Sequence, residues 1–150
     1  MILPEVNLLL HAYNAESPVH PAARKWWEQS LDGDKPVGLA WVAVLGFVRI
    51  LTHRAVFDRP ATIRQVRSVV EEWLRRSQVV LVEPGPRHAE ILFDLLESVG
   101  SAGNLTTDAH LAALAIEHHA ELLTTDADFA RFPGVRSRNP LASASASRRR

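Results

Sequence analysis

Short apolar segments alternate with longer helical segments along this chain, and the alternation limits the folds that it can adopt. Residues 2–4, 79–82 and 121–125 are typical of buried strands, and residues 135–138 predict a last one. Because parallel strands need long crossover connections, strands joined through helices predict an α/β fold with a mainly parallel central sheet in an α/β/α sandwich. Helical periodicity covers residues 7–13, 22–31, 40–51, 61–75, 88–99 and 109–119, with a short turn at 126–132.

The length of 150 residues suits a single domain, and an apolar content of 47% is sufficient for its core. Residues 1–141 are expected to form that domain. Residues 142–150 are rich in Ser, Ala and Arg without periodicity, and they predict a disordered tail.

Charge and residue usage exclude several classes of protein. The 17 basic and 17 acidic residues balance, so binding of RNA would need a local patch. The absence of cysteine excludes disulfides and thiolate metal sites. The longest apolar run, residues 36–48, is shorter than the roughly 20 residues of a membrane helix. The start of the chain lacks the basic region of a secretory signal, so a cytoplasmic protein without membrane contact is expected.

Acidic side chains stand where predicted strands end or helices begin. Glu5 follows the first strand, Asp108 enters a late helix, and Asp126 and Asp128 follow the strand at 121–125. Asp at a helix start is also a normal capping residue, and Glu5 alone reads as a solvated acid, so each position has a purely structural interpretation. If these acids lie close together, their mutual repulsion opposes ionisation unless a cation neutralises them. An all-oxygen cluster prefers Mg²⁺ or Mn²⁺.

Four segments together resemble the PIN-domain ribonucleases that form the toxin half of VapBC toxin-antitoxin pairs. They are ILPEVNLL at residues 2–9, residues 41–52, GNLTTDAHLA at 103–112 and TDADF at 125–129. The resemblance implies a PIN-like domain that cleaves RNA with Mg²⁺ and is neutralised by a cognate antitoxin. It also implies that Glu5, Asp108 and Asp126 are catalytic metal ligands, with Asp128 at the edge of the site. Further expected contributors are Asn7 beside Glu5, Thr124 beside Asp126, and Arg49 as a phosphate contact.

Two positions depart from the pattern of these toxins. Glu5 stands where they usually have Asp, and Gly46 stands where an acid is expected on the middle helix. The longer Glu5 side chain displaces its carboxylate, whereas a catalytic group tolerates only about 0.5 Å of misplacement. The resemblance, together with this longer side chain, therefore implies an endoribonuclease impaired by Glu5. The alternative is a catalytically weak or inactive binding module that keeps the antitoxin and RNA contacts.

The aromatic side chains of the helices predict either a core or an interface. Trp26, Trp27, Trp41 and Trp73 lie on amphipathic segments, where such residues more often pack than stack on bases. They offer more apolar surface than one sheet of this size covers, so a homodimer or an antitoxin complex is expected. The seven histidines have no spacing typical of zinc sites.

Overall fold

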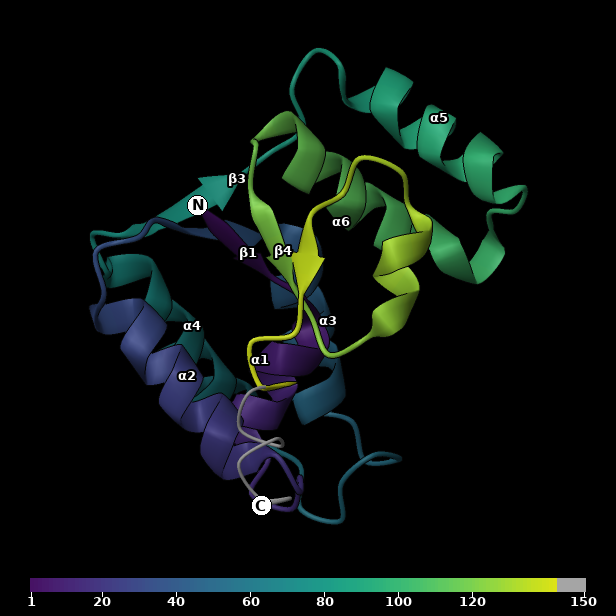
Figure 1. Ribbon diagram of the computed structural model, residues 1–150. Coiled ribbons are helices and arrows are strands. Elements are labelled where there is room, and N and C mark those ends of the chain that lie inside the picture. The colour runs from purple at the N-terminus through teal and green to yellow at the C-terminus, as the bar shows by residue number, and fades with distance from the viewer. Residues whose placement is uncertain (143–150) are drawn as a thin grey trace, which may run out of the picture.

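The computed structural model describes residues 1–142, which form one parallel sheet with helices on both faces (Figure 1). The strand order is β3-β2-β1-β4-β5, and every neighbouring pair is parallel. The strands are β1 (Ile2–Pro4), β2 (Val37–Ala40), β3 (Val79–Val82), β4 (Glu121–Leu123) and β5 (Ser137–Arg138). The helices are α1 (Val6–Tyr13), α2 (His20–Asp32), α3 (Trp41–Leu51), α4 (Ile63–Arg75), α5 (His88–Val99) and α6 (Thr106–Glu117), with short 3₁₀ helices η1 (Gly103–Leu105) and η2 (Ala127–Arg131).

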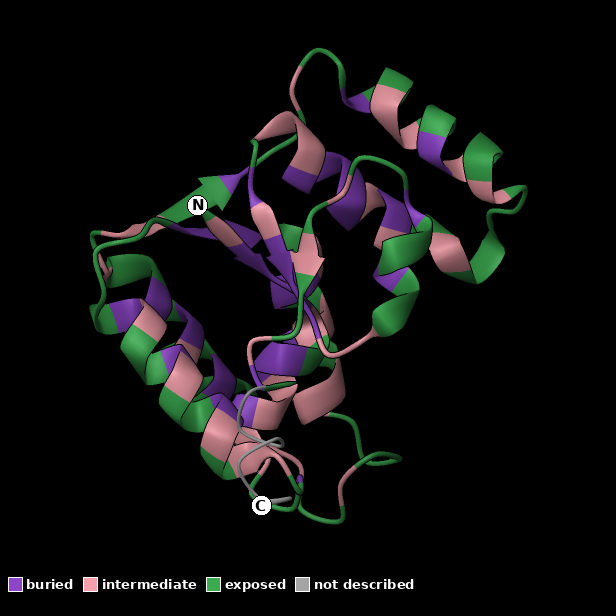
Figure 2. Cartoon of the chain, viewed as in Figure 1, coloured by how far each residue is buried: buried purple, intermediate pink, exposed green. Residues whose placement is uncertain are grey.

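The three-layer α/β/α architecture expected from the sequence is confirmed. Alternate residues of each strand point to opposite faces, so the sheet contributes to two separate cores. One core joins Val37, Leu39 and Leu123 to helices α1–α4, and the other joins Leu3, Ala40 and Leu122 to α5 and α6. Figure 2 shows the central strands buried, while the outward surfaces of the helices are exposed.

Strand β2 was not predicted, because its residues belong to the apolar run that continues into α3. Gly38 also removes the β-branched pattern that marks a strand. A Cβ atom at Gly38 would lie 2.9 Å from the Met1 sulfur and 3.3 Å from the Ile2 carbonyl oxygen. The glycine therefore allows β2 to lie close to Met1 and Ile2 at the start of the chain, and this requirement comes from the tertiary structure.

Helix α3 is apolar along most of its length, yet one of its faces lies in solvent. Trp41, Leu45 and Arg49 recur every fourth residue, and all three are exposed, with exposed fractions of 45% and 63% for Trp41 and Leu45. Arg49 therefore lies on a solvent-exposed face of the helix.

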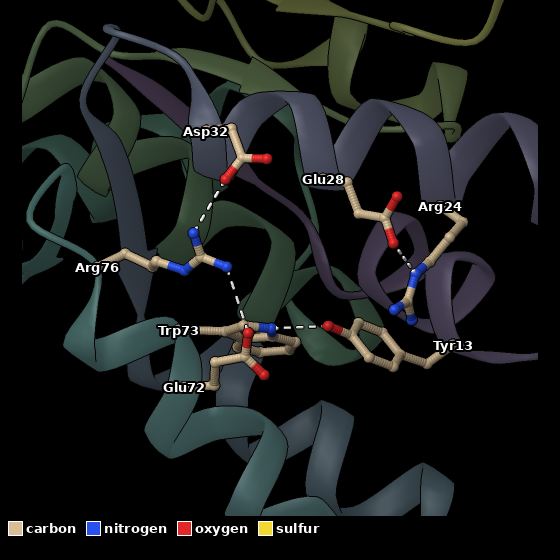
Figure 3. Close-up of polar contacts among 7 residues, drawn as sticks. All are labelled: Tyr13, Arg24, Glu28, Asp32, Glu72, Trp73 and Arg76. Carbon is tan, nitrogen blue, oxygen red and sulfur yellow. Dashed lines mark hydrogen bonds and ion pairs between the residues drawn. The ribbon is translucent and has the colours of Figure 1, made fainter.

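An aromatic cluster holds α1 against α2 and α4, and so fixes the helix that follows the first strand. The buried indole of Trp73 donates a hydrogen bond to the Tyr13 hydroxyl at 2.9 Å (Figure 3). Trp73 also packs against the buried Trp27 ring, with centroids 5.3 Å apart. Arg76 bridges Asp32 and Glu72 at 2.9 and 3.3 Å and adds a polar link between α2 and the end of α4 (Figure 3). The expected core role is confirmed for Trp27 and Trp73.

In the described part of the chain, no helix is long and apolar enough to cross a membrane. Leu141 is buried in the first core. The tail predicted at residues 142–150 lies, from residue 143 onward, outside the described residues.

Candidate active site

Glu5 lies between β1 and α1, where it is only 6% exposed. Its carboxylate caps α1, because Oε2 accepts a hydrogen bond from the backbone N–H of Asn7 at 3.0 Å. The Thr124 hydroxyl donates to the same oxygen at 3.4 Å. The pKa of Glu5 is raised to about 7, mainly by burial and also by the negative charges of Asp108 and Asp126, while the two hydrogen bonds lower it.

Asp126 leaves the sheet just after β4, the strand that pairs with β1. Buried Thr124 links the two strand ends, since its hydroxyl donates to Glu5 and accepts from the Asp126 backbone N–H at 2.9 Å. Asp126 caps η2 by accepting from the backbone N–H of Asp128 at 2.8 Å. Asp126 therefore caps a helix and also lies at the same edge of the sheet as Glu5.

Asp108 lies half-buried in the first turn of α6. Burial raises the pKa of Asp108, and the charges of Asp126 and Asp128 raise it further. Such coupling requires proximity, so Glu5, Asp108 and Asp126 share one electrostatic environment, with exposed Asp128 at its edge.

The charge of this acidic group is not neutralised by the described part of the protein. No Lys, Arg or His of residues 1–142 forms a salt bridge with Glu5, Asp108, Asp126 or Asp128. Hard oxygen donors with uncompensated charge fit Mg²⁺ or Mn²⁺. Within the same residues, no three acidic or histidine side chains are close enough to form a complete metal site. The carboxylate oxygens of the acidic group therefore suit a cation, but these side chains would have to move closer together to bind one.

Comparison with known proteins identifies the family of this chain. The family model described as "PIN domain" matches residues 2–135. The chain belongs to the PIN-domain family. Ribonuclease VapC37 of Mycobacterium tuberculosis is 44% identical over 142 residues, which cover 95% of this chain and 99% of the relative. Ribonuclease VapC33 of the same species is 41% identical over 141 residues, which cover 94% of this chain and 99% of that one.

Solved structures show the same PIN fold at lower sequence identity. VapBC2 from Rickettsia felis, bound to a DNA fragment from its promoter, has a TM-score of 0.65 at 19% identity and covers 93% of this chain and 98% of that chain. VapC20 from Mycobacterium tuberculosis, a sarcin-ricin loop cleaving toxin, has a TM-score of 0.66 at 16% identity, with 91% and 99% covered.

The remaining expected site residues of this PIN domain lie in different environments. The side chain of Asn7 is exposed next to Glu5, and only its backbone N–H contacts the carboxylate. Arg49 is exposed on α3 and forms no ion pair with a described residue. A Cβ atom at Gly46 would lie 3.1 Å from Cγ2 of Val6, so this glycine packs α3 against α1. Gly46, where the resemblance implies an acid, therefore has a packing role in this structure.

A histidine pair on the other side of α6 was not foreseen. His88 is buried, and its Nε2 lies 2.9 Å from Nδ1 of His110. Glu117 lies 3.4 Å from Nδ1 of His88 and accepts the backbone N–H of Gly85. Only the packing of α5 on α6 brings these groups together, so sequence spacing gave no signal.

The raised pKa of Glu5 predicts a measurable dependence of stability on pH. The pKa is about 7 in the folded chain, against 4.5 for an ordinary glutamate, so the folded state binds this proton more tightly than the unfolded state. Protonated Glu5 makes its full contribution to the free energy of unfolding below about pH 4.5. This contribution, about 3 kcal/mol in total, is lost as the pH rises to about 7. Glu5→Gln cannot ionise, so its stability relative to the parent should grow across this range.

The measurement is urea unfolding of both proteins between pH 4.5 and 8, with chelator present. Exposed Glu16, changed to Gln, is the matched control and should leave the pH dependence of the parent unaltered. A difference between Glu5→Gln and the parent that stays constant over the whole range would contradict the prediction.

Proposed function

We propose that this PIN domain is an endoribonuclease toxin of the VapC type that uses Mg²⁺ or Mn²⁺ to cleave RNA in the cytoplasm. The observation that carries the proposal is the grouping of Glu5, Asp108 and Asp126 without a basic partner among the described residues, in which the charges of Asp108 and Asp126 raise the pKa of Glu5 and the charge of Asp126 raises the pKa of Asp108. The printed names of relatives at 41 and 44% identity support ribonuclease activity.

The chain's own residues define the roles within this site. Asp108 and Asp126 would be the main cation ligands, with Glu5 as a third, and Asp128 would add negative charge at the edge. A bound cation would lower the pKa of a coordinated water and offset charge on the scissile phosphate. Thr124 holds Glu5 and Asp126 in register through its two hydrogen bonds. Asn7 and Arg49 would contact the RNA backbone from the exposed surface beside Glu5 and α3.

The alternative function is a PIN-fold binding module that keeps its partners but turns over slowly or not at all. The observations that favour it are Glu5 in place of Asp and the packing role of Gly46. Cleavage of a broad RNA pool by the purified chain separates the two. Cleavage in Mg²⁺ or Mn²⁺ that a chelator stops and excess cation restores supports the nuclease. RNA that stays intact in both metals supports the binding module.

Partner proteins belong to the same proposal. The neighbouring VapBC structures support a cognate antitoxin that covers the site. Exposed Trp41 and Leu45 on one face of α3 support a homodimer. Light scattering of the isolated chain tests the homodimer, and a monomer at all concentrations would contradict it.

A further inference from the structure

A small pocket opens beside Asp126, between the ends of β4 and β5. It has a volume of about 300 Å³ and is lined by Thr125, Asp126, Ala127, Ala130, Ser137 and Asn139, among others. Ligand pockets in proteins span about 300–1,000 Å³, so this one suits a single nucleoside unit but not a folded segment of RNA. Because Asp126 forms part of its wall, anything bound there lies next to the acidic site.

The wall of the pocket combines small apolar side chains with unpaired polar groups. Ala127 and Ala130 of η2 supply an apolar surface. The Thr125 and Ser137 hydroxyls form no hydrogen bond with the described residues. Asn139 uses its Oδ1 to accept the backbone N–H of Leu141 at 2.9 Å, which leaves its amide nitrogen available as a donor.

The charges around the pocket disfavour a phosphate there. Asp126 carries uncompensated negative charge, and Arg138, which also lines the pocket, forms an ion pair with Glu121 at 2.6 Å. A neutral ligand with a flat apolar face and a polar edge fits this wall better than an anion does. A nucleobase has both features, since its face packs on apolar surface and its edge carries hydrogen-bonding groups.

We propose that this pocket binds the base of a nucleotide adjacent to the scissile phosphate and so determines which sequence is cut. The inference rests on the proposed nuclease function. Ala127 and Ala130 pack on the face of the base. The amide of Asn139 and the hydroxyls of Thr125 and Ser137 form hydrogen bonds with its edge.

Two substitutions test the pocket and leave the four acidic residues of the site unchanged. Ala130→Leu fills it from an exposed position, and Asn139→Asp removes the amide donor but keeps the oxygen that Leu141 uses. Each is expected to lower kcat/KM on the preferred RNA by about 10-fold, mainly through KM, and Asn139→Asp should also change the base preferred at one position beside the cut.

The chain offers matched controls for both changes. Asn14 Oδ1 accepts the backbone N–H of Glu16 at 3.0 Å in the same local geometry as Asn139, and it lies outside the pocket. Ala89 is an exposed alanine on α5. Asn14→Asp and Ala89→Leu should cleave as the parent does. The proposal is overturned if Ala130→Leu and Asn139→Asp keep the parent's KM and base preference.

A binding experiment separates this inference from the nuclease proposal. The parent chain is titrated with each of the four ribonucleoside monophosphates and followed by NMR. Amide shifts confined to Thr125, Ala127, Ala130 and Asn139, and lost in Ala130→Leu, support the pocket even if the parent does not cleave RNA. Absence of shifts there, or equal shifts in Ala130→Leu, overturns the pocket even if the parent cleaves RNA.

Discussion

Asp108→Asn and Asp126→Asn are each expected to lower RNA cleavage by about 1,000-fold, because a cation ligand is worth several kcal/mol of transition-state stabilisation and each 1.36 kcal/mol is tenfold in rate. Both carboxylates belong to one environment, since Asp126 is among the charges that raise the pKa of Asp108. Removing either charge weakens binding of the same cation while barely altering side-chain volume. Initial rates of cleavage in Mg²⁺ provide the measurement.

The folded state should tolerate both substitutions. Asp108→Asn relieves the repulsion that raises the pKa of Asp108, so stability without metal should stay level or increase. Asp126→Asn keeps an oxygen to accept the backbone N–H of Asp128 and therefore keeps the cap of η2. Exposed Asp94 on α5, changed to Asn, is the control and should cleave normally. Cleavage within tenfold of the parent in either site variant would show that the cation is held elsewhere.

Glu5→Asp is expected to raise RNA cleavage by about 10- to 100-fold, the scale on which small misplacements of catalytic groups are felt. The shorter side chain draws the carboxylate back toward the end of β1, at the position where the resemblance to the PIN-domain toxins implies an Asp. The fold should accept the change, because Asp is among the preferred N-cap residues and can accept the Asn7 backbone N–H that Glu5 now accepts. Cleavage rates of parent and variant, compared in Mg²⁺ and in Mn²⁺, measure the effect.

Three further measurements make this result specific. The gain should disappear in chelator, and it should disappear when Asp108→Asn or Asp126→Asn is added. The same shortening at exposed Glu16 should leave cleavage at the parent level. If RNA cleavage by Glu5→Asp stays at background in both metals, the length of the side chain at position 5 is not what limits cleavage. The binding-module function then replaces the nuclease.

The sequence by itself determined the fold class and the position of the acids along the chain. Strand-like and helical periodicities depend on neighbouring residues, so they predicted the α/β/α sandwich and most of its elements. Glu5, Asp108 and Asp126 follow strands or begin helices, which was enough to select them as site candidates.

The tertiary structure decided what these local signals do not contain. Strand β2 depends on Gly38 lying close to Met1 and Ile2, and the exposed face of α3 depends on which side the core covers. The pairing of β1 with β4 brings Glu5 to Thr124, 119 residues away along the chain. The end of β5 completes the pocket beside Asp126. Strand order sets the distances between residues remote in sequence, and local periodicity carries no information about that order.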